Sequence, residues 1–153
     1  MNFQSFLRVN QIIAFAAMSS VIVILFVMYY LKSTMTYTEE DLEMSMLFLI
    51  INVAVLALSF IVSRFLKSKI VDVTKNAPLP KRLSAYRIHM IFSIAFYEMV
   101  GFMSGIFMFI SGQDYFLFIG LAVLLLIFMA FPNRMKIKSA LRISDRDLIE
   151  GLD

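Results

Sequence analysis

The stretch Ile88–Ile110, IHMIFSIAFYEMVGFMSGIFMFI, contains 23 residues and a single charged side chain, that of Glu98. A helix of about 20 residues crosses the roughly 30 Å hydrocarbon core of a bilayer, so this stretch is long enough to span one. Lipid offers the backbone no hydrogen-bond partner, which favours a continuous helix over any other structure. We therefore predict a transmembrane helix with one carboxyl group near its middle.

Three further apolar stretches accompany this one. They are Ile12–Leu31, Met44–Ser63 and Tyr115–Phe131, with 20, 20 and 17 residues and no charged side chain. Overall the chain is 61% hydrophobic and 16% charged, whereas about a quarter of the residues in a soluble domain are charged. The four stretches together predict an all-α membrane protein with four transmembrane helices.

The basic residues are concentrated in two segments, which predicts the orientation. Twelve of the fourteen Lys and Arg residues lie between the second and third stretches or after the fourth. The segment between the first two stretches instead holds Glu39, Glu40, Asp41 and Glu43. Because cytoplasmic loops are enriched in Lys and Arg, we expect both basic segments, and with them both termini, in the cytoplasm. Topology then explains the basic charge, and nucleic acid is not expected as a partner.

This orientation divides the chain into two hairpins and two cytoplasmic segments. Residues 1–70 form the first hairpin, 71–85 a connector, 86–133 the second hairpin and 134–153 a basic tail. The connector contains Asn76-Ala-Pro-Leu-Pro80, which we expect to interrupt any helix. Arg134–Leu141 is predicted either to anchor the fourth span or to form a short helix on anionic headgroups, and Ser144–Asp147 resembles a capping box.

The first and third stretches align at a constant offset. Arg8 and Val21 then correspond to Arg87 and Val100, and Ser19 corresponds to Glu98. Either a duplication of one hairpin or a chance similarity between two apolar helices explains this alignment, and the sequence leaves both open.

Glu98 is the residue that the membrane setting does not explain. A carboxyl group at the bilayer midplane costs about 2.5–3.5 kcal/mol on insertion scales, so we expect Glu98 to face the bundle and to be protonated, hydrogen-bonded or paired. The polar residues near the middle of the other stretches are its candidate partners: Ser19, Ser20, Asn52 and Ser59. Glu98 either carries a proton or cation between two states or serves as a hydrogen-bonding residue that holds helices together.

Small residues share a face with Glu98 on the predicted helix. Ala95 and Gly101 each lie three residues from Glu98, and Gly105 lies seven residues, or one heptad, from it. Small residues at this spacing let a second helix approach closely, so we predict a helix-packing face here. We expect association with further membrane subunits, or with a second copy of the chain, to use the same face.

The sequence lacks the patterns of the common enzyme classes. There is no Cys and a single His, so thiolate chemistry and a multi-histidine metal site within one chain are excluded. No phosphate-binding glycine loop, paired metal-binding histidines or nucleophile elbow is found. We expect no enzymatic activity, no cofactor and no metal.

The second hairpin resembles a known type of protein. From Tyr86-Arg87 through Glu98-Met-Val-Gly101 to Pro132-Asn-Arg-Met-Lys136 it is similar to a family of small uncharacterised bacterial four-helix membrane proteins. It also looks loosely like the proteolipid rotor subunits of rotary ATPases, which carry a mid-membrane carboxylate. In those subunits the carboxylate lies on the last helix of a hairpin, whereas Glu98 lies on the first.

Three functional hypotheses follow. The leading one is a non-enzymatic inner-membrane protein, a small subunit or accessory factor of a membrane complex, in contact with the lipid bilayer. The alternative is a proton- or cation-coupled transport component that uses Glu98. The third, binding of a lipid or small apolar ligand between the hairpins, has no residue pattern in its favour.

Overall fold

The computed structural model describes residues 3–72, 74, 76–141 and 143, and every regular element in this part of the chain is helical. The long elements are α1 (Phe3–Lys32), α2 (Glu39–Leu66), α3 (Leu79–Ser111) and α4 (Tyr115–Ala130). A π-helix, η1 (Lys67–Asp72), continues α2, and α5 (Arg134–Leu141) is a short helix that follows α4. The prediction of an all-helical chain is confirmed, whereas the capping box at Ser144–Asp147 lies outside the described residues.

Three of these helices are long and apolar enough to cross a membrane: α1, α2 together with η1, and α3. α4 has 16 residues, which gives about 24 Å and falls short of the roughly 30 Å core. α4 and α5 are bent by 73° relative to each other. Counted together, they give a fourth candidate span. The chain therefore has the helices of a multi-pass membrane protein.

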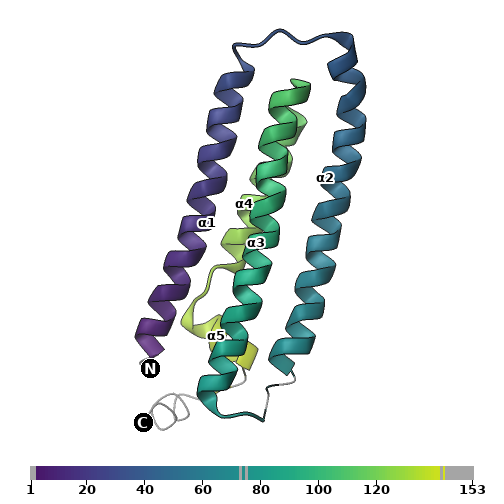
Figure 1. Ribbon diagram of the computed structural model, residues 1–153. Coiled ribbons are helices and arrows are strands. Elements are labelled where there is room, and N and C mark those ends of the chain that lie inside the picture. Colours follow the sequence, from purple (N-terminus) through teal and green to yellow (C-terminus); the bar gives the residue numbers. More distant parts are fainter. Residues whose placement is uncertain (1–2, 73, 75, 142, 144–153) are drawn as a thin grey trace.

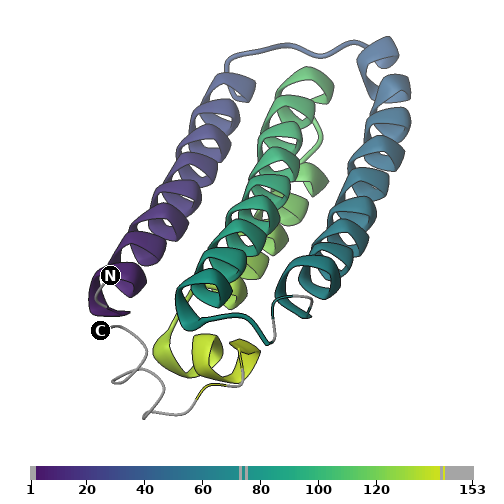
Figure 2. The ribbon, with the colours of Figure 1, turned by 60° about the horizontal axis from the view of Figure 1, so that its bottom comes forward.

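α3 is the central helix. α1, α2 and α4 all pack against it, and α1 also packs against α4. In Figures 1 and 2, α1 and α2 flank α3 on opposite sides, and α4 lies behind α3 in the view of Figure 1. The contacts of α2 fall mainly on α3 and η1, so the bundle does not close around α2.

The third long helix begins within the predicted connector. α3 starts at Leu79, inside the segment 71–85. The reason is the position of the prolines: Pro78 is the N-cap and Pro80 lies in the first turn, where a helix needs no N–H donor from that residue. Asn76–Pro78 is not helical, so the predicted interruption is present, and the prolines also set the start of α3.

Polar contacts join the hairpins at one end of the bundle. Lys32 at the end of α1 forms an ion pair with Asp114 in the turn between α3 and α4. The hydroxyl of Tyr37 donates to the carbonyl oxygen of Phe109 at 2.8 Å, and Thr38 forms a capping box with Asp41 at the start of α2. Gly112 ends α3 at φ +69°, and a Cβ there would also lie 2.7 Å from the Tyr37 ring. This turn therefore requires glycine.

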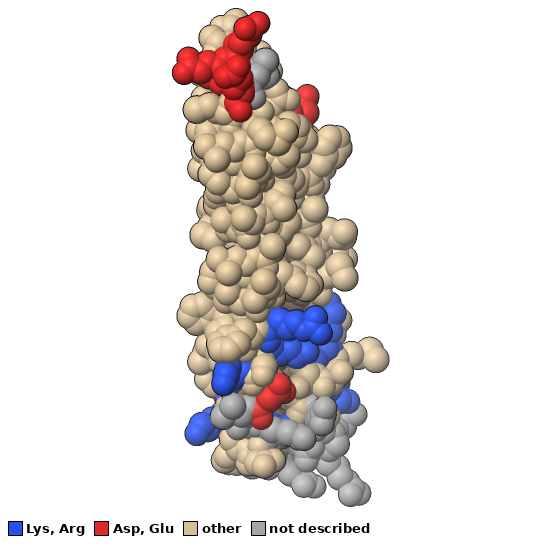
Figure 3. Space-filling model, turned by 90° about the vertical axis from the view of Figure 1, so that its right-hand side faces the viewer, with Lys and Arg blue, Asp and Glu red and all other residues tan. Residues whose placement is uncertain are grey.

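The charged residues separate along the long axis of the molecule. Figure 3 shows most of the visible Asp and Glu surface at the top, an uncharged surface below it, and Lys and Arg in the lower third, where some acidic surface also lies. We call the top the acidic end and the bottom the basic end. The basic end carries Arg64, Lys67, Lys69, Lys81, Arg82, Arg87, Arg134, Lys136 and Lys138.

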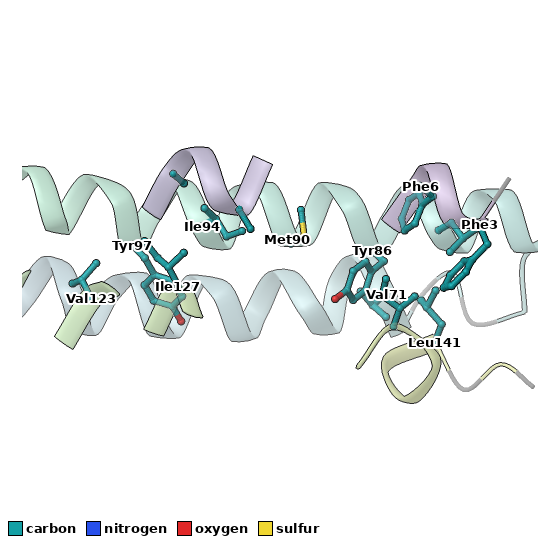
Figure 4. Close-up of a cluster of buried hydrophobic side chains, with 14 of the residues drawn as sticks. Phe3, Phe6, Val71, Tyr86, Met90, Ile94, Tyr97, Val123, Ile127 and Leu141 are labelled. Atoms are coloured by element: carbon teal, nitrogen blue, oxygen red, sulfur yellow. The ribbon is translucent and has the colours of Figure 1, made fainter. Parts of the chain in front are cut away.

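Buried apolar side chains run along the bundle toward the basic end. In Figure 4, Tyr97 of α3 lies beside Ile127 of α4. Near the basic end, Val71 of η1 and Leu141 of α5 gather below Tyr86, in the same cluster. α5 crosses this end of the bundle, as the yellow helix in Figure 2 shows, and thereby closes the apolar core from below.

Candidate functional site

The carboxyl group of Glu98 contacts the first helix. Ser20 Oγ of α1 donates a hydrogen bond to Glu98 Oε1 of α3, and it also lies 2.8 Å from the carbonyl oxygen of Ala17. α1 and α3 run in the same direction, which brings residues at equal depth together. Of the four predicted partners of Glu98, Ser20 is the one that the structure brings to it.

Proton counting constrains this contact. A serine hydroxyl has one proton to donate and two lone pairs that accept. Ser20 cannot donate to Glu98 and to Ala17 at the same time. The hydroxyl proton of Ser20 is therefore shared between an acceptor on its own helix and an acceptor on α3. Through Ser20, the Glu98 carboxyl group links α3 to α1.

The other predicted partners lie elsewhere. Asn52 of α2 is fully buried, and its Nδ2 donates to Ser104 Oγ at 2.9 Å. Ser59 donates to the Val55 carbonyl oxygen of its own helix at 2.7 Å. Ser19 is half-buried next to Ser20, but Ser20 makes the contact with Glu98. The predicted polar site is thus corrected to two separate contacts, one on each side of α3.

The predicted packing face is split in the same way. A Cβ on Gly101 would lie 2.7 Å from Val21 Cγ1 of α1, and one on Gly105 would lie 3.5 Å from Ile24 Cγ1. Both glycines are therefore occupied by α1 of the same chain, and they are not available to a partner. Ala95 is exposed and does not belong to this contact, so the face of Ala95, Gly101 and Gly105 is corrected at that residue.

A glycine outside the predicted face belongs to the same contact. Gly120 of α4 faces Leu25, and a Cβ there would lie 2.6 Å from Leu25 Cδ2. α1 thus lies in the seam between α3 and α4, with its side chains over glycines of both. Gly120 lies alone in an apolar stretch, and its partner on α1 could not be read from that pattern.

A buried polar contact at the basic end was also missed. Asn10 of α1 is fully buried, and its Oδ1 accepts a hydrogen bond from Arg87 Nε at 3.2 Å. The Arg87 guanidinium also lies 4.7 Å from the ring centre of Phe6, a cation–π distance. The signal for this contact was the alignment of the first and third stretches, which places Asn10 and Arg87 at similar depth.

A cavity of about 780 Å³ lies in the half of the bundle nearer the basic end. α2 with η1 forms one wall, α3 the floor, and α4 with α5 the other wall. Its size falls within the range of small-molecule sites. Ser63, Ser93 and His89 line it and bond to one another: the two serine hydroxyls are 2.7 Å apart, and His89 Nε2 is 3.1 Å from the Ser63 carbonyl oxygen.

Comparison with known proteins assigns neither a family nor a function to the chain. A scan against protein-family models finds no match to the chain, and neither the curated proteins nor the solved structures contain one that is similar. Across the described ranges 3–72, 74, 76–141 and 143, no group of three or more His, Asp or Glu side chains is placed to hold a metal ion. The function is therefore argued from the geometry.

Proposed function

We propose that the protein is a small non-enzymatic subunit or accessory factor of an inner-membrane complex, with four spans and both termini in the cytoplasm. The observation that carries this proposal is the open bundle. α2 packs mainly against α3 and η1, so the bundle remains open beside α2. A transmembrane helix of another subunit would complete the packing that this chain leaves unfinished.

The uncovered surface is a regular row on α3. Ile88, Phe92, Ala95, Met99, Phe102 and Ile106 are all exposed and follow helical spacing. Val100 and Gly101, which face away from this row on the helix, are buried. The row therefore lies on the side of α3 away from α4, between α1 and α2. Ala95 is the smallest residue in it, so a second helix can approach closely there.

Photocrosslinking in native membranes tests the proposal. A photoreactive residue at Ala95 is expected to yield a crosslinked protein product, either with another subunit or with a second copy. The matched control is Ala122, an exposed alanine of α4, where lipid should be the main product. A chain that extracts as a monomer in gentle detergent and crosslinks to no protein from position 95 would contradict the proposal.

Proton- or cation-coupled transport through Glu98 is the second candidate. One observation supports this candidate: Glu98 is half-buried and is not fully enclosed in the core. Glu98→Gln separates the two functions, because an amide still bonds to Ser20 but cannot carry a proton. Loss of ion flux in liposomes with unchanged folding would support transport. Unchanged flux, or no flux in the parent protein, supports the structural role of Glu98.

A further inference from the structure

The cavity between α2 and α4 has a polarity that matches a membrane lipid. We propose that it binds an anionic phospholipid of the leaflet next to the basic end, with an acyl chain inside and the headgroup at the rim. This proposal is independent of the accessory role above, which concerns the opposite side of α3.

The length of the cavity corresponds to one leaflet. Along α3 it extends from Tyr86 near the basic end to Tyr97. These residues are eleven positions apart, or about 16 Å along a helix, and half of a 30 Å hydrocarbon core is about 15 Å. An acyl chain that enters at the rim would therefore reach the middle of the membrane at Tyr97.

The inner part of the cavity is apolar. Phe60 of α2, Met90 and Tyr97 of α3, and Leu126 of α4 line it. Burying an acyl chain against such side chains costs no hydrogen bonds. The polar side chains of Ser63, Ser93 and His89 bond to one another, so this part of the wall does not require a polar ligand.

The rim of the cavity is charged, with a positive excess. Lys67, Lys136 and Asp72 line it. Within the described ranges Lys67 has no carboxylate within ion-pair distance. Lys136 donates to the carbonyl oxygens of Met129 and Phe131 at 2.7 and 3.2 Å, which leaves one of its three N–H donors for a ligand. Two cations against one carboxylate favour an anionic headgroup over a neutral one.

A lipid can enter this cavity from the side. α4 packs against α1 and α3, whereas the contacts of α2 fall mainly on α3 and η1. The gap between α2 and α4 is therefore open to the surrounding bilayer. A water-soluble ligand would have to pass the charged rim and α5, so the membrane is the more direct source of an occupant.

Native mass spectrometry of the purified full chain tests the proposal, with phosphatidylglycerol, phosphatidylcholine and inorganic phosphate as probes. Phosphatidylglycerol is expected to bind more tightly than phosphatidylcholine, and phosphate is expected not to displace it. Lys67→Gln should weaken phosphatidylglycerol binding about fivefold, the effect of one basic residue near an anionic surface. Asp72→Asn should tighten it by a similar factor.

The matched control is Lys69→Gln. Lys69 lies in the same π-helix, but its ammonium group lies over the Phe65 ring and does not line the cavity, so binding should not change. Leu126→Trp, which fills the apolar part, should abolish binding while helicity by circular dichroism is retained. Equal losses for Lys67→Gln and Lys69→Gln, equal affinity for both lipids, or displacement by phosphate would each overturn the proposal.

Discussion

Gly101 and Gly105 look alike in sequence but differ in how closely α1 approaches them. The nearest atom to a Cβ on Gly101 is a methyl of Val21, a fully buried β-branched side chain that has few alternative rotamers. At Gly105 the nearest atoms are at 3.5 Å or more, which is ordinary van der Waals contact. The two positions therefore respond differently to the same added methyl group.

We predict that Gly101→Ala destabilises the helix bundle by about 1–3 kcal/mol, the usual cost of overpacking a tight contact. Gly105→Ala, the matched control, should not reduce the stability of the bundle. Unfolding by SDS titration in mixed micelles measures both. Adding Val21→Ala to Gly101→Ala should restore part of the stability, and equal stability of the two single alanine variants would argue against close packing at Gly101.

The contact between Ser20 and Glu98 has a measurable coupling energy. Hydrogen bonds between transmembrane helices contribute about 0.6 kcal/mol on average and up to about 1.7 kcal/mol. A double-mutant cycle of Ser20→Ala and Glu98→Ala should give a coupling in this range, read from the same SDS titration. The same cycle with Ser19→Ala in place of Ser20→Ala should give no coupling energy. A coupling energy between Ser19 and Glu98, and none between Ser20 and Glu98, would show that the helices meet in a different register.

At the scale of helices, α2 differs from the other three long helices because it packs mainly against one of them, α3. In the half nearer the acidic end, Asn52 is its buried polar link to α3. Asn52 Nδ2 bonds to Ser104, and its Oδ1 has no partner in the described part of the chain. α1, α3 and α4 pack against one another without it. Loss of this link should therefore loosen α2 and leave the other three helices in place.

We predict that Asn52→Ala speeds hydrogen exchange of the α2 amides about threefold, which corresponds to the loss of an average interhelical hydrogen bond. The amides of α1 and α4 should be unaffected. Ser59→Ala is the control, because Ser59 is equally buried but bonds within its own helix. Faster exchange throughout the bundle would mean that α2 is not a separate unit.

The helices could be predicted from the sequence because hydrophobicity and length alone decide where a span forms. The partners of Glu98 could not, because several polar residues lie at similar depth and only helix packing selects Ser20 over Asn52. The same holds for Gly101: its spacing indicates a close contact but does not show that α1 makes it. The start of α3 at Leu79 was missed because prolines interrupt a helix or begin one according to their position.

For the whole molecule, the separation of charge gives the orientation a physical basis. The acidic end carries the loop between α1 and α2, and the basic end carries η1, the start of α3 and α5. Lys and Arg are retained on the cytoplasmic side during insertion, so we expect the basic end to lie in the cytoplasm. The weak point of this topology is α4, whose 16 residues are fewer than a span normally has.

The chain has no cysteine, so single cysteines report on this topology without background. Thr36→Cys, Asn76→Cys and Met135→Cys place an exposed thiol in the outer loop, in the connector and in α5. A membrane-impermeant maleimide should label Thr36→Cys in intact cells, and the other two only after permeabilisation. Asn76→Cys is the control for Met135→Cys, because α2 and α3 have ample length to span. Labelling of Met135→Cys from outside would show that the short α4 does not cross, leaving three spans.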